Sequence, residues 1–202
     1  MAISERLKAF LTTSRVAYTV TKHPVVYTAQ EIAAAQHVSG RKLAKCVLIT
    51  TDRGATLAVL PAIHLIDVRK LKILLGASKV SIAKEADIKE RFPDVEVGAM
   101  SPFGNLYNVP VVAEKSLGDS EDIVFNAGSH TETIAMRHRD FVSLVKPKIG
   151  TFGQAIGGPA KGRKAGAKRS VRRGVRPKAQ GRSRATKKAS PSRPRSAAKR
   201  RR

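Results

Sequence analysis

The chain has 202 residues, with 39 Lys and Arg against 15 Asp and Glu, a formal net charge of +24 and one cysteine. A single cysteine excludes an intramolecular disulfide framework, and because no run of about 20 apolar residues exists, we expect no membrane span and no membrane partner. The N-terminus turns charged at once and lacks the apolar stretch of a secretory signal. These features predict a cytoplasmic protein.

The positive charge is concentrated at the C-terminal end. From Ala155 onward there are 19 Lys and Arg and no acid, while the first 154 residues hold the other 20 basic and all 15 acidic side chains. The basic segment contains almost no large apolar residue, so it cannot bury enough surface to offset the entropy of ordering. We therefore expect one folded domain over residues 1–150 and a disordered Lys/Arg/Ala/Pro-rich tail over residues 151–202.

The first predicted elements are a helix, a strand and a second helix. Leu7, Phe10 and Leu11 repeat at helical spacing, and residues 18–20 follow as a strand. Thr28 and Glu31 match a capping box, in which each side chain bonds to the backbone of the other residue. The second helix should run to about His37.

A hairpin and a third helix come next. Asp52-Arg53-Gly54 lies between the apolar runs 46–50 and 56–60, a hairpin signature with glycine for the position of positive φ. Asp67 should cap a helix through Leu75 that Gly76 closes.

The last part of the domain is predicted to be strand-rich. A short helix over 86–91 precedes Pro93, and a helix over 140–145 closes the domain. Strands are expected near residues 95–97, 109–113, 123–125 and 133–136. The order predicts an α+β, or mixed α/β, domain in which hairpins outnumber regular βαβ units.

Familiar catalytic signatures are missing. The five histidines lack metal-ligand spacing, and no dinucleotide-binding or P-loop glycine pattern occurs. We therefore expect no metal and no cofactor. Because no nucleophile is evident, an enzyme of this sequence should work by positioning and polarising its substrate.

Three polar or glycine-rich segments stand at the edges of predicted strands, where loops carried by a rigid sheet commonly build a site. They are residues 40–45 (GRKLAK), 98–105 (GAMSPFGN) and 126–130 (NAGSH). The Gly98–Pro102 loop can aim backbone N–H groups at a carbonyl oxygen and so stabilise an oxyanion. Lys45 can supply a point charge, and His130 can hydrogen bond or wall the pocket. In the plainer alternative, they are a turn, a solvated lysine and a structural histidine.

With these segments in this order, the chain resembles the YbaK and prolyl-tRNA synthetase-associated editing-domain family of free-standing aminoacyl-tRNA deacylases. The resemblance runs from about His23 to Phe141. It is carried by residues 43–48, 57–61, 74–77, 97–102 with 109–112, and 126–130. It implies a compact fold with a curved mixed sheet and flanking helices, and a pocket for the aminoacylated 3′ end of tRNA.

The resemblance also implies roles for particular residues. Lys45, Gly98 and His130 match catalytic positions, although some family members have no histidine at the last. The matches to substrate-binding positions are Ala99, Met100, Ser101, Pro102 and Gly128. The implied reaction is hydrolysis of the ester between a wrongly attached amino acid and the terminal ribose. Lys45 would anchor the terminal nucleotide or the acyl group, since nothing in the sequence around it indicates a lowered pKa.

The basic tail lies outside this resemblance. Its cations include Lys161, Arg163, Lys164, Lys168, Arg169, Arg172 and Arg173. A flexible cationic segment binds polyphosphate through counterion release, so we expect it to recruit tRNA. It also resembles histone H1-like tails, which makes DNA or the ribosome an alternative partner. The competing hypothesis for the whole chain is a non-enzymatic nucleic-acid-binding or regulatory protein. The acyl group and the oligomeric state stay open.

Overall fold

Short helices and paired strands alternate along the chain in the computed structural model, which describes residues 3–156. The α-helices are α1 (Glu5–Thr13), α2 (Ala29–Ala35), α3 (Val68–Leu75), α4 (Glu85–Arg91) and α5 (His138–Val145). Two 3-10 helices are η1 (Gly104–Tyr107) and η2 (Lys115–Asp119). The strands are β1 (Tyr18–Lys22), β2 (Ala44–Thr51), β3 (Gly54–Pro61), β4 (His64–Ile66), β5 (Val80–Ile82), β6 (Val111–Glu114), β7 (Asp122–Asn126), β8 (Glu132–Arg137), β9 (Lys148–Gly150) and β10 (Gly153–Ala155).

The strands form three sheets. A mixed five-stranded sheet has the order β5-β2-β3-β6-β9, in which β3, β6 and β9 are parallel and the other pairs antiparallel. An antiparallel sheet has the order β1-β8-β7, and β10 pairs with β4. A parallel bridge between Leu43 and Val124 joins the two larger sheets. The predicted mixed α+β class, with more hairpins than βαβ units, is confirmed.

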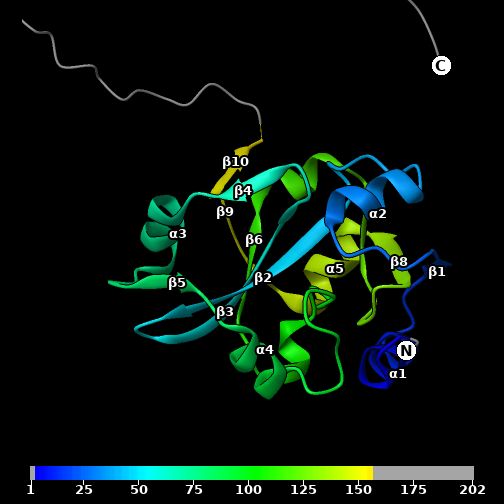
Figure 1. Ribbon diagram of the computed structural model, residues 1–202, viewed down its shortest axis with the longest axis horizontal. Helices are drawn as coiled ribbons and strands as arrows, with labels where there is room; N and C mark the ends of the chain where they lie inside the picture. Colours follow the sequence, from blue (N-terminus) through cyan, green and yellow to red (C-terminus); the bar gives the residue numbers. More distant parts are fainter. Residues whose placement is uncertain (1–2, 157–202) are drawn as a thin grey trace, which may run out of the picture. The chain divides into compact units, whose positions relative to one another are not determined.

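Alternation along β2 divides the apolar side chains between two faces of the five-stranded sheet. Ala44, Cys46 and Leu48 pack into the largest core, together with residues of α1, α4 and α5. On the other face, Leu43 lies in a core with Ile32 of α2, and Ile49 lies in a core with Leu71 of α3. Figure 1 shows α2 and α3 towards opposite ends of β2.

The local signals for the first elements are confirmed. Thr28 and Glu31 form both bonds of the capping box, and α2 ends at Ala35, two residues before its predicted end. The 52–54 turn joins β2 to β3. Asp67 accepts bonds from the N–H groups of Arg69 and Lys70, and Gly76 ends α3 in the left-handed conformation.

Other predictions were wrong or incomplete. Residues 95–97 form an irregular segment, because their polar groups bond to another loop, described below. Strands β4, β5, β9 and β10 were not predicted, because three residues are too few to show a periodic pattern. Secondary structure continues to Ala155, past the predicted boundary at residue 150. The predicted tail cations from Lys161 onward lie outside the described residues.

A buried carboxylate holds the C-terminal end of this domain. Glu114, the last residue of β6, is 3 % exposed. Its Oε2 accepts bonds from the backbone N–H groups of Phe152, at 2.6 Å, and of Gly153. Phe152 is fully buried beneath α3, and its carbonyl accepts from the N–H of Asp67. Glu114 therefore fixes the segment that covers one end of the sheet.

Replacing Glu114 by Ala should destabilise the protein by about 2–5 kcal/mol, because it leaves two buried N–H donors unpaired. Glu114→Gln should cost less, since its amide oxygen can still accept one bond. Urea unfolding followed by circular dichroism measures both variants. An alanine variant as stable as the wild type would contradict this role.

Candidate functional site

Lys45 lies near the start of β2, on the sheet face that α2 and α3 cover. Its Nζ donates to the carbonyl O of Ala62 at 3.3 Å, and Gln30 Nε2 of α2 approaches the same oxygen at 3.4 Å. Lys45 is half-buried and forms no ion pair among residues 3–156. Burial lowers the pKa of its ammonium group. The sequence around Lys45 gives no indication of this shift, because the burial comes from residues distant in sequence.

The loop from Gly98 to Pro102 presents unused backbone donors. Gly98 has φ +89°, a left-handed conformation that glycine adopts without strain. The backbone N–H groups of Gly98, Met100 and Ser101 donate to no acceptor in the described part of the chain. The four residues after Gly98 are buried, and the Met100 side chain lies in the largest core. The Met100 side chain is therefore part of the core, and an N–H without an acceptor is the kind of group that can stabilise an oxyanion.

Two loops far apart in sequence are tied together by Glu96. Its backbone N–H donates to the carbonyl O of Gly128 at 3.0 Å, and its carboxylate accepts from the N–H of His130 at 2.9 Å. Asn126 Nδ2 lies 3.5 Å from the carbonyl O of Gly98. The predicted site residues Gly98, Gly128 and His130 are thus brought together in one cluster.

Gly128 occupies a buried position at the back of this cluster. It has φ +106°, and a Cβ added there would lie 3.2 Å from Cβ of Ser4. The N–H of Ser4 donates to the carbonyl of Ala127. The segment before α1 therefore packs against the 126–130 loop at Ala127 and Gly128.

The protonation of the His130 ring follows from its contacts. Nε2 lies 2.9 Å from the carbonyl O of Val97. Because a carbonyl only accepts, Nε2 carries the proton, and Nδ1 of the neutral ring holds a lone pair. The ring lies against Gly98, whose added Cβ would be 3.4 Å from Cε1, and its centroid is 4.9 Å from that of the exposed Tyr27.

Buried acceptors without donors surround the cluster. His130 Nδ1, Asn126 Oδ1 and His23 Nε2 are buried and have no hydrogen-bond partner among residues 3–156. For His23, the contact of Nδ1 with the carbonyl of Pro24 at 2.8 Å places the proton on Nδ1. An unsatisfied buried polar group costs about 1–3 kcal/mol. A bound donor would relieve that cost.

The start of β2 lies next to β7, the strand that leads into the 126–130 loop. Leu43 pairs with Val124 in the parallel direction, and the N–H of Val124 donates to the carbonyl of Lys42. Lys45 lies two residues beyond this bridge in β2, and Asn126 lies two residues beyond it in β7. Neither Glu96 nor Asn126 was predicted as a site residue, although both stand within or next to the predicted segments.

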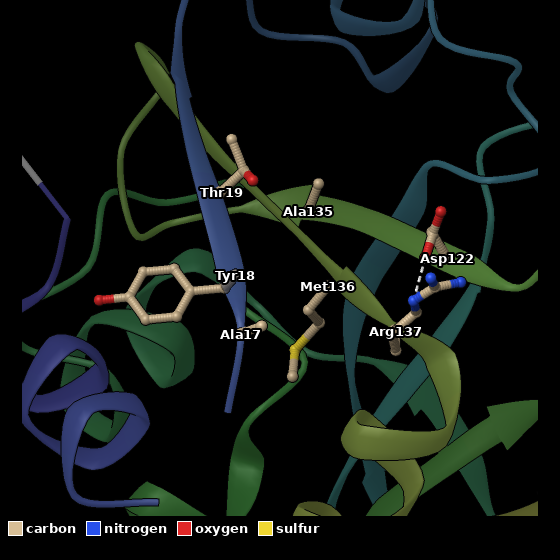
Figure 2. Close-up of a pocket in the computed structure, with 7 residues that line it drawn as sticks. All are labelled: Ala17, Tyr18, Thr19, Asp122, Ala135, Met136 and Arg137. Atoms are coloured by element: carbon tan, nitrogen blue, oxygen red, sulfur yellow. Dashed lines mark ion pairs between the residues drawn. The ribbon is translucent and has the colours of Figure 1, made fainter. Parts of the chain in front are cut away.

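The surface also has a hollow of about 320 Å³ on the β1-β8-β7 sheet. Figure 2 shows its lining residues, with Asp122 and Arg137 joined by an ion pair of 3.5 Å. None of the sequence-predicted site residues lines it. It lies where Tyr18 pairs with Met136, whereas the 126–131 loop joins the opposite end of β8, where Lys22 pairs with Glu132. The hollow is separate from the candidate site.

Two absences apply to residues 3–156. Among them, no three His, Cys, Asp or Glu side chains are arranged to hold a metal ion. No helix in the same range has the length and apolar character to cross a membrane.

Comparison with known proteins identifies the domain. Residues 23–144 match the family model described as the aminoacyl-tRNA editing domain. The chain belongs to this family. A curated relative, "Multifunctional Ser/Thr-tRNA deacylase ProXp-y" of Escherichia coli K12, is 24% identical over 153 residues, which cover 73% of this chain and 91% of the relative. The same protein of Escherichia coli O157:H7 matches equally.

Solved structures confirm the fold of this editing domain. A crystal structure described as "a putative trans-editing enzyme for prolyl tRNA synthetase" has a TM-score of 0.68 at 18% identity, covering 75% of this chain and 97% of that chain. The crystal structure of "hypothetical protein APE2540" has a TM-score of 0.69 at 17% identity, covering 74% of this chain and 100% of that chain.

Gly98→Ala should destabilise the editing domain by about 1–2 kcal/mol, because alanine resists a φ of +89°. The new Cβ, 3.4 Å from Cε1 of His130, should also shift the NMR signals of that ring. Gly118→Ala is the matched control, since its Cβ would approach Cε1 of His138 at 3.3 Å without a positive φ. Equal losses of stability in both variants would contradict the role of backbone conformation at Gly98.

Proposed function

We propose that the protein is a trans-editing deacylase that hydrolyses the ester bond of mischarged aminoacyl-tRNA. The observation that carries this proposal is the group of unused N–H donors in the Gly98–Ser101 loop, set beside acceptors that lack donors. An ester carbonyl develops negative charge on its oxygen in the transition state, and fixed N–H groups stabilise that charge without reorganising. Membership of the editing family supports the same reaction class.

The reaction needs no nucleophile from the protein. The oxygen of a water molecule attacks the ester carbonyl, the vicinal ribose hydroxyl can relay the proton of that water to the departing ribose oxygen, and the loop N–H groups bind the resulting oxyanion. Collapse breaks the bond to the ribose oxygen, which takes up a proton. With water as the final acceptor of the acyl group, the products are the free amino acid and tRNA with an intact 3′ end.

Lys45 is assigned to the terminal nucleotide in this proposal. Its half-buried ammonium has no carboxylate partner among the described residues, so the site lacks a negative charge that a phosphate would supply. The thiol of Cys46 next to it packs towards the largest core on the opposite face, where burial raises its pKa. A protonated thiol turned away from Lys45 is unsuited to attack.

The acceptors without donors favour an acyl group that carries a hydroxyl. Asn126 Oδ1 or His130 Nδ1 would accept a bond from the hydroxyl of a seryl or threonyl side chain, a donor that an alanyl side chain lacks. The name of the Escherichia coli relative, a Ser/Thr-tRNA deacylase, supports this choice. The basic tail remains assigned to tRNA recruitment on its sequence alone.

Lys45→Met should lower kcat/KM for mischarged tRNA by about 10- to 100-fold, mainly through KM, because a phosphate contact exists in both ground and transition states. Lys42→Met, which removes an exposed charge from the same segment, is the control and should leave kcat/KM near the wild-type value. The assay follows release of the amino acid by the full chain from tRNA(Pro) charged with Ser, Thr, Ala or Cys. Hydrolysis no faster than the spontaneous rate for every pair would favour the non-enzymatic nucleic-acid-binding hypothesis.

Seryl and threonyl esters should be hydrolysed at least ~10-fold faster than alanyl esters at equal tRNA concentration, because only their side chains carry a hydroxyl that can donate to one of the buried acceptors. Asn126→Leu should narrow this ratio, and Asn105→Leu in η1 should not. The ratio of two substrates on one preparation is independent of the fraction of folded enzyme. A preference for alanyl esters would contradict the hydroxyl assignment while leaving the deacylase proposal standing.

A further inference from the structure

A strongly cationic surface surrounds α3. We define the α3 surface by six exposed side chains: Arg53, Arg69, Lys70, Lys72, Lys79 and Lys148. Arg69, Lys70 and Lys72 belong to α3 itself. The guanidinium of Arg53 lies near Gly76, and Lys148 Nζ donates to the carbonyl O of Leu74, so both approach the C-terminal end of the helix.

The carboxylates nearby are engaged with backbone groups. Asp67 accepts from two N–H groups in the first turn of α3. Asp52 accepts from Ser78 and from the N–H of Lys79, and these bonds hold its pKa well below the usual range. None of the six cations forms an ion pair within the described residues. The α3 surface therefore has six cations and only two nearby carboxylates, both of which already accept hydrogen bonds from the backbone. The positive charge of the six cations is available to a partner.

The α3 surface and Lys45 share one face of the five-stranded sheet. Leu43, just before β2, and Ile49, in β2, point to this face beneath α2 and α3 respectively. Lys45 lies an even number of residues from both, so its side chain points to the same face. The six residue-to-residue steps from Lys45 to Thr51 span about 20 Å at ~3.3 Å per step. The hairpin tip at that end carries Arg53, and Figure 1 shows α3 at the same end of β2.

We infer that the α3 surface binds the phosphate backbone of the tRNA whose aminoacylated 3′ end enters the site at Lys45 and Gly98. The chemistry is that of a polyanion, because unpaired Lys and Arg side chains gain affinity by releasing condensed counterions. At ~3.4 Å of helix axis per phosphate of one strand, taken from duplex DNA, 20 Å corresponds to about six phosphates. The body of an RNA anchored at its 3′ end would thus pass over α3.

Contacts between the α3 surface and RNA phosphates would fix the position of the RNA and would not read its base sequence. The α3 surface offers ammonium and guanidinium groups around Ile73, which is 81 % exposed, and it includes no aromatic side chain for stacking on bases. Phosphate contacts of this kind fix the register of a nucleic acid and carry no base information. The inference rests on the proposed function for its choice of tRNA as the partner, but the contact itself requires no hydrolysis.

The test compares two triple variants of the full chain. Arg69→Gln/Lys70→Gln/Lys72→Gln removes the charges of α3. Lys8→Gln/Lys89→Gln/Arg91→Gln is the matched control, because it removes one Arg and two Lys from exposed positions of α1 and α4, which pack against the opposite face of the sheet. Binding of uncharged tRNA is measured between 50 and 300 mM salt, and circular dichroism verifies that both variants are folded.

The α3 variant should bind tRNA about ten-fold more weakly at ~0.1 M salt. Its plot of log K against log salt should be shallower by about 2 to 3, since each lost phosphate contact removes about 0.7–0.9 from the slope. The control should keep the wild-type slope. For charged tRNA, KM should rise with kcat unchanged, and hydrolysis of a short aminoacyl-CCA ester should not change.

Equal effects of the two variants on tRNA binding would overturn the inference. So would an α3 variant that loses binding to anionic phospholipid vesicles but keeps its affinity for tRNA, because the surface would then serve a membrane. Failure of the proposed function gives a different result: no aminoacyl-tRNA is hydrolysed, while the tRNA-binding comparison between the two variants still decides the role of α3.

Discussion

The candidate site depends on the hydrogen bonds that Glu96 makes to a loop more than 30 residues away. Its N–H donates to Gly128, and its carboxylate accepts from the N–H of His130. A hydrogen bond to a charged group contributes about 1.5–3 kcal/mol, roughly twice a neutral one. These bonds hold the Gly98 loop against the histidine ring. Without them, the unused donors of one loop and the unused acceptors of the other would have no fixed relation.

The site contains polar groups without hydrogen-bond partners, whereas a fold selected for stability alone would pair them. Among residues 3–156, His130 Nδ1 and Asn126 Oδ1 have no hydrogen-bond partner, and the N–H groups of Met100 and Ser101 donate to no acceptor. Buried polar groups are almost always paired in native proteins. A local excess of both donors and acceptors is therefore the kind of inconsistency expected where a ligand completes the structure.

The sequence predicted the elements whose signals are local. The capping box at Thr28, the Asp67 cap and the glycine turn at residue 54 each depend on a few neighbouring residues, and all three are present. The segment 95–97 was predicted as a strand and is irregular. Its partners are instead a distant glycine and histidine, and such tertiary contacts leave no mark on local periodicity.

In the candidate site, too, local sequence patterns were predictable and the effects of tertiary contacts were not. Lys45, Gly98 and His130 could be found in the sequence because they match a family pattern. The lowered pKa of Lys45 could not be predicted from the sequence. Burial of its ammonium group depends on helix α2, which precedes β2 in the chain, and on the turn at Ala62, which follows β3. Likewise, the lone pair on His130 Nδ1 is defined only by the contact of Nε2 with Val97.

The α3 surface and the site divide recognition from chemistry. Contacts to phosphates far from the ester are equal in the ground and transition states, so they raise affinity without lowering the barrier of the chemical step. The N–H groups near Gly98 would gain strength only as the oxyanion forms, and they therefore act on that barrier. Helix α3 can vary in charge without changing the Gly98 loop, because none of the hydrogen bonds of that loop involves a residue of α3. Such an arrangement permits one editing pocket to be combined with different tRNA-binding surfaces.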